Sequence, residues 1–176
     1  GGENDLKGHY HNPNIPSEEI LTTPRAGDAD GIVYATKPLS YQGQLIENFS
    51  VRFENGKVVE VKAEKNQELL EKMVSMDEGA AMLGECALIA YDSPINNLGI
   101  LFYNTLFDEN ASCHLALGRG FSNCVRGYED MTNEQLKEHG INDSMIHVDF
   151  MIGSKDLSIT GITAKGERVA IFKDGN

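Results

Sequence analysis

The stretch that decides the fold class runs from Ser50 to Val61: Ser50-Val51-Arg52-Phe53-Glu54, then Asn55-Gly56, then Lys57-Val58-Val59-Glu60-Val61. On both sides of Asn55-Gly56, apolar and polar residues alternate, as they do in strands that bury one face. Asparagine and glycine both tolerate positive φ, which the tight turn of a two-residue hairpin requires. The stretch therefore predicts a β-hairpin, within a strand-like region that extends from Gly31 to Ala63.

Toward the C-terminus the pattern changes to helical spacing over residues 65–83. The apolar residues that can share one helix face there are Leu69, Leu70, Met73, Met76 and Met82. Gly79 interrupts this run and is expected to end a first helix. The short apolar segment from Glu85 to Tyr91 then predicts a strand.

The second half of the chain predicts another helix and more strands. Thr132 with Gln135 forms a capping-box start, and Gly140 a stop, for a short helix. Residues 144–152 predict a buried strand, and residues 157–172 predict a hairpin that turns at Lys165-Gly166. The sum is an α+β fold: a strand-rich, mixed-sheet domain with two or three helices.

The length of the chain and the residues at its two ends predict the domain organisation. A chain of 176 residues suits one sizeable domain. We expect residues 15–176 to form it and residues 1–14 to be an irregular lead-in. The chain starts with Gly1-Gly2 and no Met, and stops within what reads as a turn. These ends predict a piece of a longer protein.

Charge and cysteine content narrow the class of protein. The net charge of -12 argues against nucleic acid or an anionic membrane as a partner, and favours metal ions or substrates with a protonated amine. No apolar run approaches the ~20 residues of a membrane span. Cys86, Cys113 and Cys124 cannot all pair, which favours a reduced, cytoplasmic protein with buried thiols that bind no metal.

Chemistry is first suggested by His147-Val148-Asp149. On a strand, His147 and Asp149 point to one face while Val148 and Phe150 point to the other. The apolar neighbours predict burial, and a buried charged aspartate is costly unless it is paired or bound to a cation. The alternative is a surface histidine beside an ordinary charge.

Three other carboxylate-containing segments add potential ligands. Glu85 lies in an otherwise apolar run, although a solvent-facing strand edge is slightly favoured for this segment alone. Glu109 and His114 lie within one stretch of small residues and could meet at one site. Glu19 follows a turn at Pro16 and precedes a strand, where a glutamate is ordinarily solvated.

Taken together, the segments supply mostly oxygen ligands and two imidazoles: Glu19, Glu85, Glu109, His114, His147 and Asp149. This set suits a pair of divalent ions such as Zn, Co or Mn. In a two-metal hydrolase such ions polarise the scissile carbonyl and lower the pKa of a bridging water. A spare carboxylate accepts the proton of that water and passes it to the leaving amine.

Around these positions the sequence resembles the M29 family of aminopeptidases, the aminopeptidase T, aminopeptidase S and PepS group of thermophilic metalloproteases. The stretches that carry the resemblance are Ile15-Pro16-Ser17-Glu18-Glu19-Ile20, Thr22-Thr23-Pro24, Thr36-Lys37-Pro38-Leu39, Asp77-Glu78-Gly79-Ala80, Leu83-Gly84-Glu85, Phe102-Tyr103-Asn104-Thr105-Leu106-Phe107-Asp108-Glu109-Asn110-Ala111-Ser112-Cys113-His114 and His147-Val148-Asp149-Phe150-Met151-Ile152-Gly153. The resemblance covers nearly all of the chain from about Pro13 onward.

The resemblance implies specific roles for these side chains. The metal ligands would be Glu19, Glu85, His114, His147 and Asp149. Glu85 would bridge both ions, and Glu109 would be a further ligand or the general base. The family implies removal of N-terminal residues from peptides with two divalent ions, homodimers, and an α/β N-terminal domain that is absent here.

Two questions stay open at the level of sequence. The family pattern has a tyrosine seven residues after the His114 position, where this chain has Phe121. Phe121 either packs and weakens activity, or Tyr128 supplies the missing hydroxyl. The main alternative function is a non-catalytic scaffold for the metal site and the dimer. A mononuclear iron oxygenase is disfavoured because no histidine follows Asp149.

Overall fold

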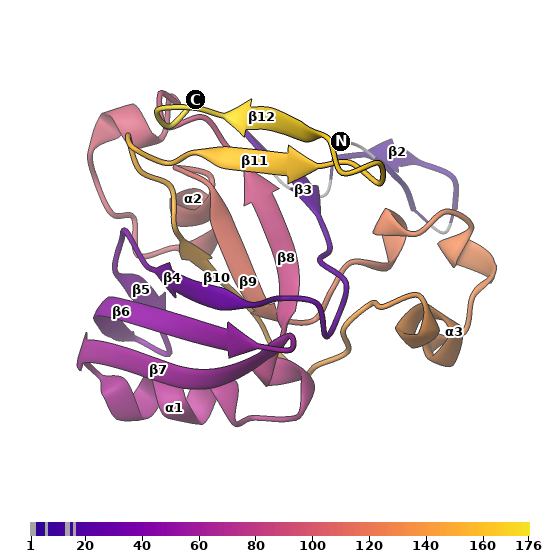
Figure 1. The fold of residues 1–176 in the computed structure, drawn as a ribbon, viewed down its shortest axis with the longest axis horizontal. Helices are drawn as coiled ribbons and strands as arrows, with labels where there is room; N and C mark the ends of the chain where they lie inside the picture. Colours follow the sequence, from indigo (N-terminus) through magenta and orange to yellow (C-terminus); the bar gives the residue numbers. More distant parts are fainter. Residues whose placement is uncertain (1–2, 6, 13–14, 16) are drawn as a thin grey trace.

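The computed structural model describes residues 3–5, 7–12, 15 and 17–176. The predicted strand-rich α+β class is confirmed (Figure 1). The strand pairs among these residues are antiparallel, where the sequence had suggested a mixed sheet. The turn expected at Pro16 lies outside the described residues.

The first sheet is built around one long strand. Its members are β4 (Gly31–Tyr34), β5 (Leu39–Tyr41), β6 (Gln44–Glu54) and β7 (Lys57–Lys65). Strand β6 pairs with each of the other three. The turn between β6 and β7 is the predicted hairpin, with φ of 51° at Asn55 and 76° at Gly56.

The second sheet carries the candidate ligands. It has the order β10-β9-β8-β3. Its members are β3 (Ile20–Thr22), β8 (Leu83–Leu88), β9 (His114–Gly118) and β10 (His147–Met151). The strands predicted over 85–91 and 144–152 are confirmed with shifted bounds, whereas no strand had been predicted over 114–118. All residues of β9 are buried, so it lacks the alternation that identifies a half-exposed strand.

Among the described residues, three α-helices and four short 3-10 helices join the strands. The α-helices are α1 (Gln67–Val74), α2 (Thr105–Glu109) and α3 (Asn133–Glu138), and the 3-10 helices are η1 (Gly79–Ala81), η2 (Asn96–Leu98), η3 (Ser122–Cys124) and η4 (Tyr128–Asp130). Helix α1 ends before Gly79, which starts η1 instead, and Met76 is 43% exposed rather than part of the buried face. The capping box of Thr132 and Gln135 is present at α3.

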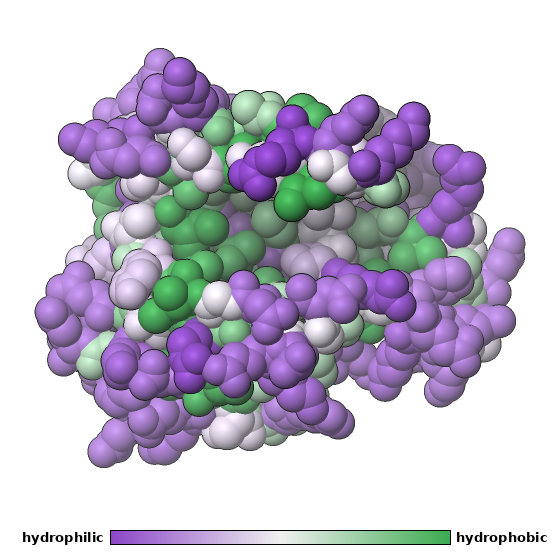
Figure 2. Space-filling model, in the orientation of Figure 1, coloured by the Kyte–Doolittle hydropathy of each residue, from purple (hydrophilic) through white to green (hydrophobic). Residues whose placement is uncertain are grey.

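A small hairpin lies near each end of the chain. Strands β1 (Glu3–Asn4) and β2 (Tyr10–His11) pair within the expected lead-in, which is therefore not wholly irregular. Strands β11 (Ile159–Ile162) and β12 (Arg168–Phe172) form the predicted C-terminal hairpin. Figure 2 shows hydrophobic residues gathered in a hollow between this hairpin and the sheet that holds β4.

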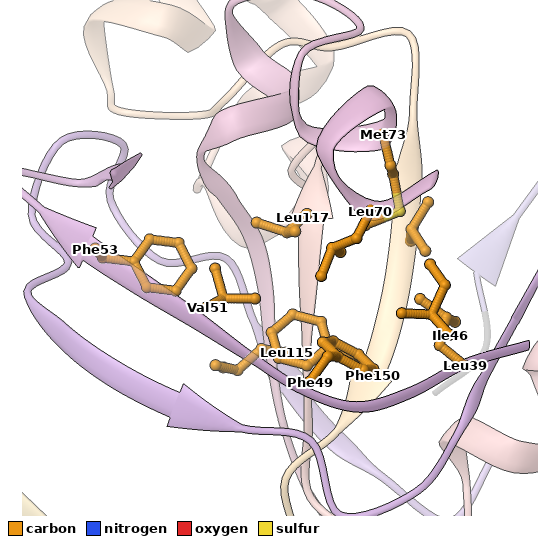
Figure 3. Close-up of a cluster of buried hydrophobic side chains, with 11 residues drawn as sticks. Leu39, Ile46, Phe49, Val51, Phe53, Leu70, Met73, Leu115, Leu117 and Phe150 are labelled. Atoms are coloured by element: carbon orange, nitrogen blue, oxygen red, sulfur yellow. The ribbon is translucent and has the colours of Figure 1, made fainter. Parts of the chain in front are cut away.

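The hydrophobic core joins the first sheet and α1 to one face of the second sheet (Figure 3). The rings of Phe49 on β6 and Phe150 on β10 lie 5.7 Å apart. Leu115 and Leu117 of β9 enter the same core, which leaves the opposite face of the second sheet for His114 and its neighbours.

The three cysteines are free thiols. Cys113 is buried and Cys86 is half-buried, as expected, but Cys124 is exposed. None of the helices in the part of the chain that the structure describes is long and apolar enough to cross a membrane.

Candidate metal centre

The strand register brings two carboxylates to either side of Ala116. Asp149 on β10 lies opposite Ala116, and Glu85 on β8 lies opposite the same residue. His114 is two residues from Ala116 on β9 and therefore points to the same face. The small Ala116 side chain leaves space between the carboxylates, so residues distant in the sequence share one row of the sheet.

His147 faces the two carboxylates with one ring nitrogen. Its Nε2 atom lies 3.0 Å from Glu85 Oε2 and 3.3 Å from Asp149 Oδ1. Its Nδ1 atom donates to the Arg119 carbonyl oxygen at 2.7 Å. The prediction that His147 and Asp149 share a face of the strand is confirmed, while Val148 and Phe150 enter the core.

His114 lies between two glutamates. Its Nε2 atom is 3.2 Å from Glu19 Oε2 and 3.9 Å from Glu85 Oε1, while Nδ1 donates to the Ser112 carbonyl oxygen at 3.1 Å. Glu85 is only 3% exposed, so the solvent-facing alternative for this residue is wrong. Glu85 therefore contacts both imidazoles, one with each carboxylate oxygen.

Helix α2 contacts the segment that holds Glu19 and carries Glu109 at its C-terminal end. The Glu18 amide donates to Asn110 Oδ1 at 2.7 Å, which fixes the segment before β3 against the end of α2. Asp108 accepts from the amides of Phe102 and Asn104 and holds the preceding loop. Glu109 ends α2 and is buried near Asp149, which acts on its pKa. Among the described residues it is not part of either group of potential metal ligands.

The electrostatics follow from burial of several carboxyl groups around two imidazoles. Burial, followed by the charge of Asp149, raises the pKa of Glu109 to about 8. Burial also raises the pKa of Glu85. Burial opposes charge on His114, but its interactions with Glu19, Asp149, Ser112 and Glu85 together outweigh this and raise the pKa of the ring to about 9.

The remaining two pKa values show the same competition. Burial opposes the charged form of His147, yet Asp149 and Glu85 raise its pKa to about 10. Burial also disfavours an ionised Asp149, and its contacts with His147 outweigh this and lower its pKa. The cluster thus holds ionised groups that depend on one another for compensation.

The donor atoms fit divalent cations. Potential ligand atoms of Glu19, Glu85 and His114 lie within 4.8 Å of one another, as do those of Glu85, His147 and Asp149. Glu19 Oε2, His114 Nε2 and Asp149 Oδ1 are buried and make no well-aligned hydrogen bond, although each has an oppositely charged neighbour at 3.2–3.3 Å. A buried polar atom left unsatisfied costs ~1–3 kcal/mol, which a cation at these oxygens and nitrogens would offset.

The sequence did not reveal the groups that orient the imidazoles. The acceptors for Nδ1 are backbone carbonyls of Ser112 and Arg119, and a carbonyl leaves no signature in the sequence. Phe121 packs on His147 with ring centroids 4.9 Å apart. The departure from the family pattern had already drawn attention to Phe121, and the packing alternative is the one that this contact supports.

Fold and site together define an α+β domain with a buried carboxylate–imidazole cluster suited to metal. The chain matches the family described as thermophilic metalloprotease (M29) over residues 1–176, and it belongs to this family.

The relatives carry aminopeptidase names. Aminopeptidase AmpS of Bacillus subtilis (strain 168) is 53% identical over 175 residues, which cover 99% of this chain and 43% of that protein. Aminopeptidase 2 of Geobacillus stearothermophilus is 46% identical over 100% of this chain and 43% of that protein. The structure of wild-type AmpT from Thermus thermophilus is 40% identical and matches with a TM-score of 0.91, over 99% of this chain and 43% of that one. The chain thus spans less than half the length of these relatives.

Proposed function

We propose that residues 15–176 form the metal-binding catalytic domain of an aminopeptidase that removes N-terminal residues from peptides. The observation that carries the proposal is the pair of ligand groups that share Glu85. One ion would be held by Glu19, Glu85 and His114, and the other by Glu85, His147 and Asp149. The aminopeptidase names of the relatives support the reaction class.

The ligand chemistry suits Zn, Co or Mn, because the set combines carboxylate oxygens with imidazole nitrogens. Divalent ions at these positions would polarise a peptide carbonyl and make water more acidic. Glu109 would take a proton from that water and deliver it to the leaving amine. Without metal, burial raises the pKa of Glu109 to about 8. Cations at the neighbouring carboxylates would lower this pKa and favour the ionised form that accepts a proton.

The activity is tested with the protein loaded with Co or Zn and an amino-acid amide that releases a fluorophore. Glu85→Gln should lower turnover by about 100-fold or more, because even partners that only orient a ligand often contribute 10–100-fold. Glu68→Gln, an exposed glutamate on α1, is the matched control and should keep full activity. Near-wild-type rates in Glu85→Gln would contradict the bridging role.

A second candidate is a non-catalytic scaffold that holds metal and supports dimerisation. The chain covers 43% of aminopeptidase AmpS, which favours this candidate if the rest of that protein completes the substrate cavity. The two candidates separate if the 176-residue chain binds metal but releases no fluorophore while the longer polypeptide is active. Homodimers, which the family resemblance implies, are tested by light scattering after size-exclusion chromatography.

A further inference from the structure

A short segment that leaves β9, residues 118–121, contacts the Nδ1 side and the ring of His147. We call this segment the strap. The Arg119 carbonyl oxygen of the strap accepts the hydrogen bond from His147 Nδ1 at 2.7 Å. The Phe121 ring packs against the imidazole at an interplanar angle of 54°. The position of the strap therefore determines where His147 Nε2 points.

One hydroxyl group ties the strap to the strand that follows Glu19. The Phe121 amide donates to Thr23 Oγ1 at 2.8 Å, and that hydroxyl lies 3.4 Å from the Phe121 carbonyl oxygen, to which it donates. A Cβ atom at Gly120 would lie 2.7 Å from the Thr23 methyl group, so the strap passes directly over this side chain. Thr23 is the residue immediately after β3.

The other edge of the strap is fixed by backbone and amide groups. Asn142, which is buried, donates from Nδ2 to the Gly118 carbonyl oxygen at 2.6 Å. The Arg119 amide donates to the Ile146 carbonyl oxygen at 2.7 Å. The Gly120 amide donates to the Asn142 carbonyl oxygen at 2.9 Å, so the peptide that carries the Arg119 carbonyl is fixed as well. The Thr23 hydroxyl is the side-chain contact at the Phe121 end of the strap.

We propose that Thr23 is a positioning residue that holds His147 Nε2 toward Glu85 and Asp149 through the strap. Without its hydroxyl, the Phe121 end is released, and the aromatic contact that keeps the imidazole against the Arg119 acceptor loses its alignment. The consequence for metal binding rests on the proposed function, but the orientation of His147 does not. The effect is local, since His114 is held by Ser112 and not by the strap.

The first test measures orientation without metal. In EDTA-treated protein, NMR follows the exchange of the His147 Nδ1 proton with solvent. Thr23→Val keeps the side-chain shape and removes the hydroxyl, and it should speed this exchange by about tenfold, the scale of one hydrogen bond. Thr23→Ser should restore the slow exchange. Thr22→Val is the matched control, because Thr22 is an exposed neighbour on β3, and it should exchange like the wild type.

The second test measures ion affinity by calorimetric titration with Zn. Thr23→Val should weaken by roughly tenfold the binding phase that His147→Ala removes, and leave unchanged the phase that His114→Ala removes. An exchange rate in Thr23→Val equal to the wild type overturns the proposal. If Thr23→Val speeds exchange but the wild type binds no ion, the positioning role stands and the proposed function fails.

Discussion

At the scale of single residues, the cluster should make stability depend on pH. The folded-state pKa is raised to about 9 for His114 and about 10 for His147, both above the usual value of 6.5. A raised pKa means that folding binds protons, so this stabilisation is complete below pH 6.5 and is lost as the pH rises toward these values. Glu109, raised from 4.5 to about 8, acts in the same direction at lower pH.

We therefore expect EDTA-treated protein to lose stability between pH 6.5 and pH 9. The expected loss is about 1.4 kcal/mol or more, the free energy of one pKa unit. Urea unfolding at a series of pH values measures it, and His114→Gln should flatten the curve. The lowered pKa of Asp149 acts only at acidic pH, below its usual value of 3.8. A free energy of unfolding that rises between pH 7 and pH 9 would contradict this assignment.

Residue patterns predicted part of the cluster. The spacing of His147 and Asp149 was sufficient to place both on one face, because strand alternation is a local property. The meeting of Glu85 with Asp149 depends on the pairing of both strands with β9, which no local pattern encodes. Residue types alone gathered Glu19 and His114 into one candidate set, but no spacing indicated that they meet; only the family resemblance implied that both are ligands.

At the scale of elements, the β6–β7 hairpin depends on Gly56. Its φ is +76°, and a Cβ atom there would lie 2.2 Å from the Gly27 Cα atom. Gly56→Ala should therefore cost more than the ~1–2 kcal/mol of a left-handed conformation alone. Gly43→Ala is the control, because Gly43 has φ of +74° but nothing within 4 Å of the added atom. Equal thermal midpoints for the two variants would show that the Gly27 contact adjusts without cost.

Elements with clear local signals were predicted better than those defined by contacts. The Asn55-Gly56 turn and the Thr132 capping box are chemical requirements of the local backbone. Helix α1 stops short of Gly79 in a region where Asp77 caps the Ala80 amide and also accepts from the Met145 amide. Contacts of this kind link residues far apart in the chain, so periodicity alone could not place the end of the helix.

At the scale of the whole molecule, whether the metal centre forms depends on where the cluster lies, rather than on how much of its relatives' length the chain spans. Both groups of potential ligands lie within this chain, although it spans 43% of its aminopeptidase relatives. They lie on the face of the second sheet opposite the core, and none of them belongs to the hydrophobic cluster. The metal centre should therefore form in the 176-residue chain by itself, whether or not catalysis does.

This leads to a prediction about metal and stability. Ions that bind only the folded chain should stabilise it, by about 2.7 kcal/mol at a free concentration 100 times the dissociation constant. We expect Zn or Co to raise the thermal midpoint of EDTA-treated protein, with the gain saturating at two ions per chain.

Sodium chloride at matched ionic strength should not reproduce the effect, because general screening leaves the buried donor atoms unsatisfied. Glu85→Gln should remove most of the gain, since both ligand groups share that carboxylate. Saturation at one ion would leave a single site and contradict the bridging geometry, while an unchanged midpoint would contradict metal binding by this domain.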